Sequence, residues 1–178
     1  MVKRRNQNEG KFIFSRKTTR LPGYDYSQPG MYFVTVCTHR RRCCLGEVVD
    51  GEKRLTRLGK IVREEWKNLS RHYINVNLDE IIVMPDHIHG IVQIMETNQI
   101  CGRGGFRNPP LRPRHDLSEI VRGFKTWSAR RINQIQGEAG GRFWQRSFYD
   151  HIIRDENDLE NIRRYIRYND QKWERYRD

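Results

Sequence analysis

The sequence lacks any long hydrophobic run. No stretch approaches the roughly 18 to 20 consecutive apolar residues that a membrane-spanning helix needs, and the mean hydropathy is -0.90. The basic residues 1–10 are followed by no apolar core, so we expect no secretory signal peptide. These absences predict a cytoplasmic protein without a membrane-spanning segment.

Cysteine is scarce, and its spacing excludes a disulfide framework. The four cysteines stand at positions 37, 43, 44 and 101 and form no Cys-x-x-Cys pair, so we expect them to be reduced. The sequence also lacks an internal repeat at the spacing of a solenoid. A chain of 178 residues has the length of one ordinary domain.

Acidic residues are too few to balance the basic ones. Lys and Arg number 34 against 22 Asp and Glu, which gives a formal net charge of +12. This charge is typical of nucleic-acid binding, and binding to a membrane surface is the competing interpretation. The cations Arg40, Arg41 and Arg42 follow the first predicted strand, where either a solvated loop or contact with DNA phosphates is expected.

Hydrophobic periodicity predicts one domain of strands and helices. Residues 1–29 are polar and turn-rich, which indicates an N-terminal arm before a domain at 30–178. Inside the domain, residues 96–115 are rich in Gly, Pro and Arg, which predicts a flexible basic loop. Strands are predicted at 31–38, 76–84 and 88–95, a strand or extended segment at 143–154, and helices at 57–72, 116–136 and 155–173.

Two histidines open the third predicted strand. Because side chains alternate along a strand, His87 and His89 share one face, where two imidazoles can converge on one metal ion. A hydrogen-bonded pair of structural histidines fits the same pattern. On the last helix, Tyr165 and Asn169 are four residues apart and therefore stacked one turn above the other, although a helical tyrosine is usually a packing residue.

Two cations on the long predicted helix are further candidates for DNA binding. Arg122 and Lys125 belong to the part of helix 116–136 that carries few apolar side chains. A solvated charge is the default interpretation of each, and contact with a DNA phosphate is the functional one.

Several motifs together resemble one family. The stretch Met84-Pro85-Asp86-His87-Ile88-His89-Gly90 resembles the histidine-hydrophobe-histidine (HUH) motif of single-tyrosine transposases. Residues 143–146, 151–154 and 165–169 resemble the C-terminal signature of the REP-associated tyrosine transposases, and residues 21–26 and 30–35 resemble their N-terminal block. Two departures are visible: Asp86 stands where Asn is common, and Asn169-Asp170 replaces the usual Asn-Pro.

The resemblance implies a fold, a substrate and a chemistry. The expected fold is a ferredoxin-like α+β domain, an antiparallel sheet with helices packed on one face. The expected substrate is single-stranded DNA with a hairpin, which Tyr165 would nick through a covalent 5′-phosphotyrosine while His87, His89 and Asn169 hold Mg or Mn. The family contains monomers and dimers, and we expect a monomer.

Two other functions fit the same residues. In one, the protein is a metal-dependent nuclease that uses water as the nucleophile, and Tyr165 only packs. In the other, the protein is a non-catalytic module that binds single-stranded nucleic acid through cations and stacked aromatic side chains.

Overall fold

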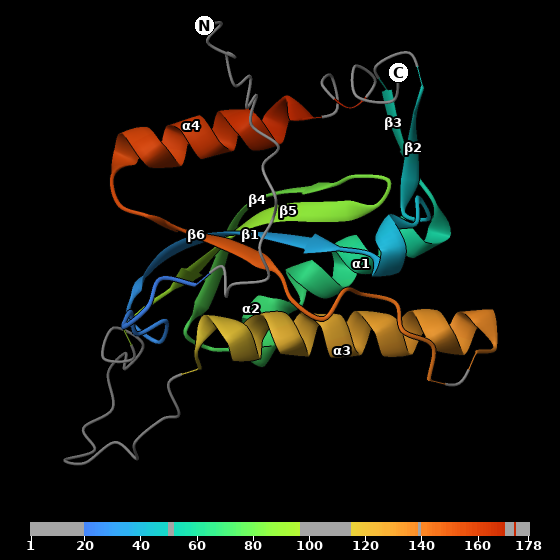
Figure 1. Ribbon diagram of the computed structural model, residues 1–178, viewed down its shortest axis with the longest axis horizontal. Helices are drawn as coiled ribbons and strands as arrows, with labels where there is room; N and C mark the ends of the chain where they lie inside the picture. Colours follow the sequence, from blue (N-terminus) through green and yellow to red (C-terminus); the bar gives the residue numbers. More distant parts are fainter. Residues whose placement is uncertain (1–19, 50–51, 97–114, 139, 170–172, 174–178) are drawn as a thin grey trace, which may run out of the picture.

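The computed structural model describes residues 20–49, 52–96, 115–138, 140–169 and 173 (Figure 1). Two predictions therefore fall largely outside the described residues: the arm up to residue 19, and the basic loop at 97–114. Cys101 lies outside them as well. Cys37, Cys43 and Cys44 are free thiols, in agreement with the sequence.

A four-stranded antiparallel sheet forms the centre of the molecule. Its strands stand in the order β4-β5-β1-β6, and each neighbouring pair is antiparallel. The bounds are Gly30–Cys37 for β1, Val76–Val83 for β4, His87–Ile94 for β5 and Tyr149–Ile153 for β6. The predicted strands are confirmed, except that the segment before residue 149 is extended and contributes only a bridge between Thr38 and Trp144.

The helices begin and end at the residues that favour such ends. The helices are α1 at Arg57–Lys67, α2 at Leu69–His72, α3 at Leu117–Gln136 and α4 at Glu156–Arg167. The Asp116 and Asp155 side chains accept hydrogen bonds from the first turns of α3 and α4, and α3 ends at Gly137 with φ 69°. The strands of the central sheet, with α1 and α3, follow the order β1-α1-β4-β5-α3-β6, which is the ferredoxin-like arrangement, and α4 follows as an additional helix.

Helices lie on both faces of the sheet (Figure 1). Ile88 and Val92 of β5 point to the face that packs against α1 and α3, in a core that includes Trp66 and Phe124. Ile91 points to the other face, in a smaller cluster with apolar side chains of α4. The α+β class is confirmed, but the expectation that all helices pack on one face holds only for α1 to α3. A stripe of apolar residues on a predicted helix indicates that the helix is packed against something, but it does not indicate which face of the sheet the helix covers.

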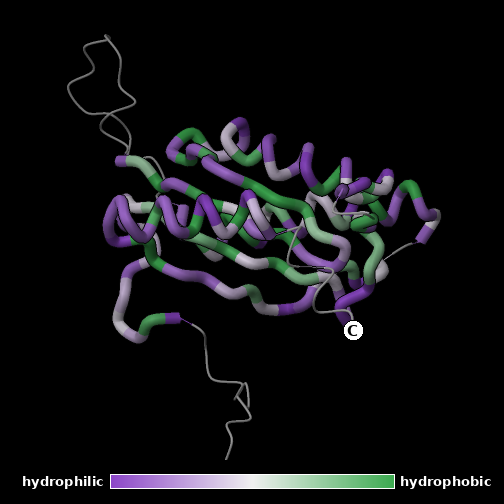
Figure 2. The backbone as a smooth tube through the Cα atoms, turned by 90° about the horizontal axis from the view of Figure 1, so that it is seen from above, coloured by the Kyte–Doolittle hydropathy of each residue, from purple (hydrophilic) through white to green (hydrophobic). Residues whose placement is uncertain are grey.

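A short hairpin outside the sheet was not predicted. Its strands are β2 (Gly46–Val49) and β3 (Glu52–Leu55), which pair only with each other. The long helices carry hydrophilic residues among the hydrophobic ones, and hydrophobic stretches follow the central strands (Figure 2). Among the described residues, no helix combines the length and the hydrophobicity needed to span a bilayer.

Candidate active site

The two histidines of β5 point at one another on the sheet face that α4 covers. Each side chain belongs to a residue that is only 5% exposed, and the two Nε2 atoms lie 2.9 Å apart. The alternation of β5 produces this geometry, because Ile88, between them, is directed into the opposite core. The pair is therefore held on a strand that is hydrogen-bonded on both sides, by β1 and β4.

The second nitrogen of each ring has its own polar partner. Asp86 Oδ1 lies 2.5 Å from His87 Nδ1, and Thr35 Oγ1 lies 2.8 Å from His89 Nδ1. Because a carboxylate only accepts hydrogen bonds, His87 donates Nδ1–H to Asp86 and turns the lone pair of its Nε2 toward His89. Such outer partners orient the imidazoles of metal sites.

His89 is a neutral ring at physiological pH. Burial, and then the charges of His87 and Arg41, lower the pKa of His89 to about 3. A neutral imidazole has one nitrogen lone pair, which its tautomer directs either to Thr35 or to His87. With Nδ1–H donated to Thr35, both Nε2 lone pairs face the same point in space.

These donors fit a divalent cation. Two nitrogens 2.9 Å apart stand at about the separation of neighbouring ligands in an octahedral site with bonds of about 2.1 Å. Asn169, which is 7% exposed, lines the same pocket and offers an amide oxygen. Nitrogen and amide oxygen together suit Mn, and the oxygen suits Mg.

Tyr165 brings its hydroxyl to the histidine pair. Its Oη lies 3.3 Å from His89 Nε2, although the two residues are 76 positions apart in the chain. The ring packs edge-on against Phe33, which stacks on His89. Tyr165 is 40% exposed, so a substrate can reach the hydroxyl from the pocket of about 430 Å³ that Tyr165, Asn169 and both histidines line.

Two ion pairs fix α4 above this pocket. The Arg163 guanidinium donates to both carboxylate oxygens of Asp79, at 3.1 and 2.6 Å, and Arg167 donates to Glu80 Oε1 at 2.9 and 2.7 Å. Both carboxylates belong to β4, where the pairing with β5 is irregular between Leu78 and Ile81. This irregular segment therefore holds the helix that carries Tyr165.

The predicted DNA-binding cations lie in different places. Arg41 lines the pocket of the histidine pair and forms an ion pair with Asp86 at 3.0 Å, whereas Arg40 and Arg42 line a separate hollow. Arg122 is exposed on α3. Lys125 Nζ donates to the backbone carbonyls of residues 145, 146 and 147 at 2.9, 3.2 and 2.9 Å, so it organises the segment before β6. DNA binding by these side chains remains a prediction.

Two site residues were not recognised in the sequence as partners of the histidines. Asp86 was noted only as a departure from a motif, although an acid directly before a histidine can hold its ring. Thr35 gives no local signal, because its contact with His89 depends on the register in which β1 pairs with β5. His151 of β6 forms a hydrogen bond with Asp158 at the start of α4.

Comparison with known proteins shows which family the chain resembles. The model of the IS200-like transposases matches residues 110–169. An uncharacterized protein of Haemophilus influenzae is 35% identical over 176 residues, covering 91% of this chain and 92% of its own length. A REP-associated tyrosine transposase of the same organism is 29% identical over 148 residues, covering 82% and 72%. Residues 110–169 therefore match the IS200-like transposases, and most of the chain is similar to a REP-associated tyrosine transposase.

The fold agrees with that similarity. A solved REP-associated tyrosine transposase, bound to a REP hairpin, superimposes with a TM-score of 0.58 at 21% identity, covering 86% of this chain and 73% of the other. The matched family segment contains α3, β6 and α4, and hence Tyr165 and Asn169. The family match indicates a transposase, and hence an enzyme that cleaves DNA.

Proposed function

We propose that this transposase nicks single-stranded DNA near hairpins and transfers the strand through a covalent 5′-phosphotyrosine on Tyr165. The observation that carries the proposal is the 3.3 Å separation of the Tyr165 hydroxyl from His89 Nε2, within one pocket. A nucleophile beside a pair of converging imidazoles fits an attack on a phosphodiester, whose oxygens must be shielded before an anionic nucleophile can approach.

The cleavage step is balanced without a further reactant. Tyr165 Oη forms a bond to phosphorus, and the bond from phosphorus to the 3′ oxygen breaks. The phenol loses one proton and the departing 3′ oxygen takes up one, which gives a 3′-hydroxyl. Strand transfer reverses the step with a new 3′-hydroxyl as the attacking group, so the bond energy is conserved and no ATP is needed.

We also propose that His87, His89 and Asn169 hold Mg or Mn. The ion, when bound, would polarise a nonbridging phosphate oxygen and offset its charge. Asp86 and Thr35 keep the two imidazoles in place. Arg41 reaches the same pocket and adds a positive charge next to the phosphate.

The proposed partner is hairpin DNA, and the proposed active unit is a monomer. A net charge of +12 favours binding to a polyanion, and the solved relative with the same fold is bound to a REP hairpin. Tyr165 lies 3.3 Å from His89 of the same chain, so a single copy is able to complete the proposed site. Light scattering at working concentration, with and without hairpin DNA, tests the oligomeric state.

Trapping the covalent product tests the chemistry. Labelled single-stranded hairpin DNA with Mn should give a protein–DNA adduct that survives denaturation, and Tyr165→Phe should abolish it. His87→Ala and His89→Ala should abolish the adduct while retaining most of the DNA affinity, because distributed cations supply that affinity. The control is Tyr168→Phe, a neighbouring exposed tyrosine that should leave the adduct yield unchanged.

The same experiment separates the alternatives. Cleavage without an adduct would replace the proposal with a nuclease that uses water. Binding without cleavage would leave a non-catalytic DNA-binding protein. Loss of binding and cleavage together in the histidine variants would indicate that His87 and His89 support the fold.

A further inference from the structure

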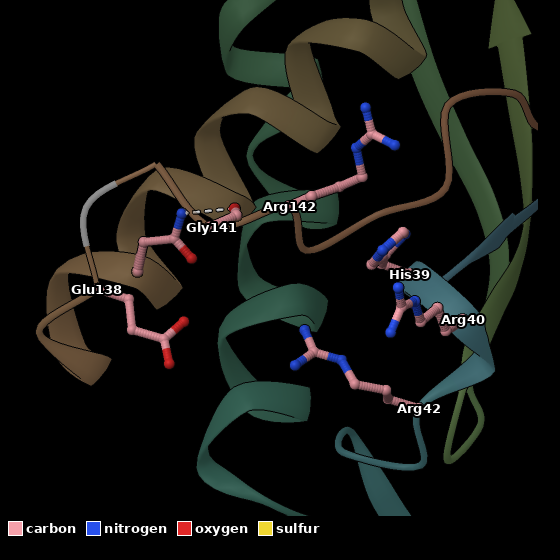
Figure 3. Close-up of a pocket in the computed structure, with 7 residues that line it drawn as sticks. His39, Arg40, Arg42, Glu138, Gly141 and Arg142 are labelled. Atoms are coloured by element: carbon pink, nitrogen blue, oxygen red, sulfur yellow. Dashed lines mark hydrogen bonds between the residues drawn. The ribbon is translucent and has the colours of Figure 1, made fainter.

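A second hollow, lined by cations, takes residues from the same turn as Arg41 of the active-site pocket and shares no lining residue with that pocket. It has a volume of about 310 Å³ and is lined by His39, Arg40 and Arg42 at the end of β1 and by Arg142 before β6 (Figure 3). A backbone hydrogen bond of 2.7 Å from His39 N to Phe143 O joins the two segments. The hollow is therefore built from two parts of the chain about a hundred residues apart.

The backbone turn at 39–41 distributes consecutive arginines between the two sites. Arg40 and Arg41 have positive φ angles of 57° and 55°, a conformation that costs free energy for a residue with a side chain. As a result, the Arg41 side chain reaches Asp86 and the active-site pocket, while Arg40 and Arg42 line the hollow. One strained turn thus supplies cations to two adjacent sites.

The positive charge of the hollow is not neutralised by nearby carboxylates. Among the described residues, the Arg40, Arg42 and Arg142 guanidinium groups form no ion pair, and the one acidic residue that lines the hollow is Glu138. Three cations therefore face one carboxylate. Loss of hydration, followed by the charges of Arg142, Arg40 and Arg42, lowers the pKa of His39 below 6.5, so all three charges act on one imidazole.

We propose that this hollow binds a backbone phosphate of the DNA strand, a few nucleotides from the phosphate that Tyr165 attacks. A guanidinium group offers paired donors to phosphate oxygens, and like charges brought together are stabilised by a bound anion. The two sites would hold one strand at two points across the 39–42 turn. Holding the strand at two points would determine which phosphate lies next to the Tyr165 hydroxyl. The inference rests on the proposed function because it takes DNA as the ligand.

A protein–DNA double-mutant cycle tests the contact. Binding of hairpin DNA is measured by fluorescence anisotropy in the Tyr165→Phe background, where the strand is not cut. Single phosphates are replaced in turn by neutral methylphosphonate. We expect one position other than the scissile phosphate at which the replacement weakens binding about tenfold.

Charge-removing variants assign that position to the hollow. Arg40→Gln with Arg42→Gln should weaken binding about tenfold and then be insensitive to methylphosphonate at that position, because the contact is already lost. Arg142→Gln, in the other segment, should behave in the same way with a smaller loss. The matched control, Lys67→Gln with Arg71→Gln on α1 and α2, removes the same charge but should retain the full methylphosphonate effect.

The charge of Glu138 provides a test with the opposite sign. Glu138→Gln should strengthen DNA binding about twofold, since it removes a negative charge from the rim of an anion site. Weaker binding in this variant would overturn the inference. The inference would also be overturned if the losses of DNA affinity from the arginine substitutions and from methylphosphonate were additive. The same holds if the arginine variants lost no more affinity than the Lys67→Gln, Arg71→Gln control.

Failure of the inference and failure of the proposed chemistry give different results. If the arginine and methylphosphonate effects are non-additive but no covalent adduct forms, the phosphate contact is supported and the tyrosine mechanism is refuted. An adduct with purely additive losses would support the mechanism and remove the hollow from the DNA path. Absence of DNA binding by the parent protein would overturn both.

Discussion

Gly90 of β5 lies against the Trp66 side chain of α1, one residue after His89. A Cβ atom added there would lie 2.4 Å from Trp66 Cζ2 and 2.9 Å from Cε2 and Cη2. Carbon atoms normally approach to about 3.5 Å, so the strand or the indole must move by about 1 Å. Trp66 is 1% exposed and packs edge-on against the buried Phe124, so it cannot give way cheaply.

Gly90→Ala should therefore destabilise the protein and displace the histidine pair. Overpacking of a rigid core costs about 1 to 3 kcal/mol, and the size of the overlap points to the upper end. For a chain of this length, 3 kcal/mol corresponds to a fall in melting temperature of about 6 to 10 °C. A displacement of about 1 Å at His89 should reduce DNA cleavage by up to about a hundredfold.

Thermal unfolding and adduct yield measure the two effects. The matched control is Gly30→Ala on the neighbouring β1, where the added Cβ meets only ordinary contacts at 3.5 Å or more. It should leave the melting temperature almost unchanged. Trp66→Phe should be less harmful in the Gly90→Ala protein than in the parent, because the smaller ring makes room for the methyl group. A Gly90→Ala protein that melts and cleaves like the parent would refute this reasoning.

Two further predictions concern side chains that hold segments around the site. Asp79→Asn should lower adduct yield about fivefold, since it removes the negative charge and one of the two acceptor oxygens that anchor Arg163 and α4. The hydrogen bonds from Arg163 hold the pKa of Asp79 below 3.8. The ion pair therefore stabilises the folded protein above about pH 4, and this stabilisation is lost as the pH falls through the lowered pKa. The difference in melting temperature between the parent and Asp79→Asn should shrink in that acidic range. Lys125→Met should lower the melting temperature by about 5 °C because three backbone carbonyls lose their donor, and an unchanged melting temperature would contradict that role.

The elements predicted best are those with strong local signals. The β-branched run of β1 and the two ends of α3, Asp116 and Gly137, appear in the structure where the sequence placed them. The four-residue spacing of Tyr165 and Asn169 also proved informative, because Tyr165 on α4 and Asn169, two residues beyond the end of α4, both line the histidine pocket. In each case the determining interaction lies within one turn of helix or one strand.

Features that depend on tertiary placement could not be predicted. The β2–β3 hairpin is short, and the strand Glu52–Leu55 is mostly charged, so its pattern resembles a loop. In the sequence, Arg40, Arg41 and Arg42 are indistinguishable consecutive cations. Their distribution between two sites depends on the positive φ angles of the turn, which the sequence does not reveal. Two further features depend on how the elements assemble. One is the face of the sheet that α4 covers, and the other is the hydrogen bonding of Lys125 to backbone carbonyls about twenty residues further along the chain.

The central claim, that Tyr165 becomes covalently attached to DNA, is tested most directly by peptide mapping of the trapped product. Trypsin cuts after Arg164 and Arg167, so Tyr165 is the only tyrosine in its peptide and is separated from Tyr168. The account predicts that the 5′-phosphate nucleotide mass is carried by the peptide 165–167 alone. A modification on the exposed Tyr149 or Tyr168 instead, or cleaved DNA with no modified peptide, would contradict it.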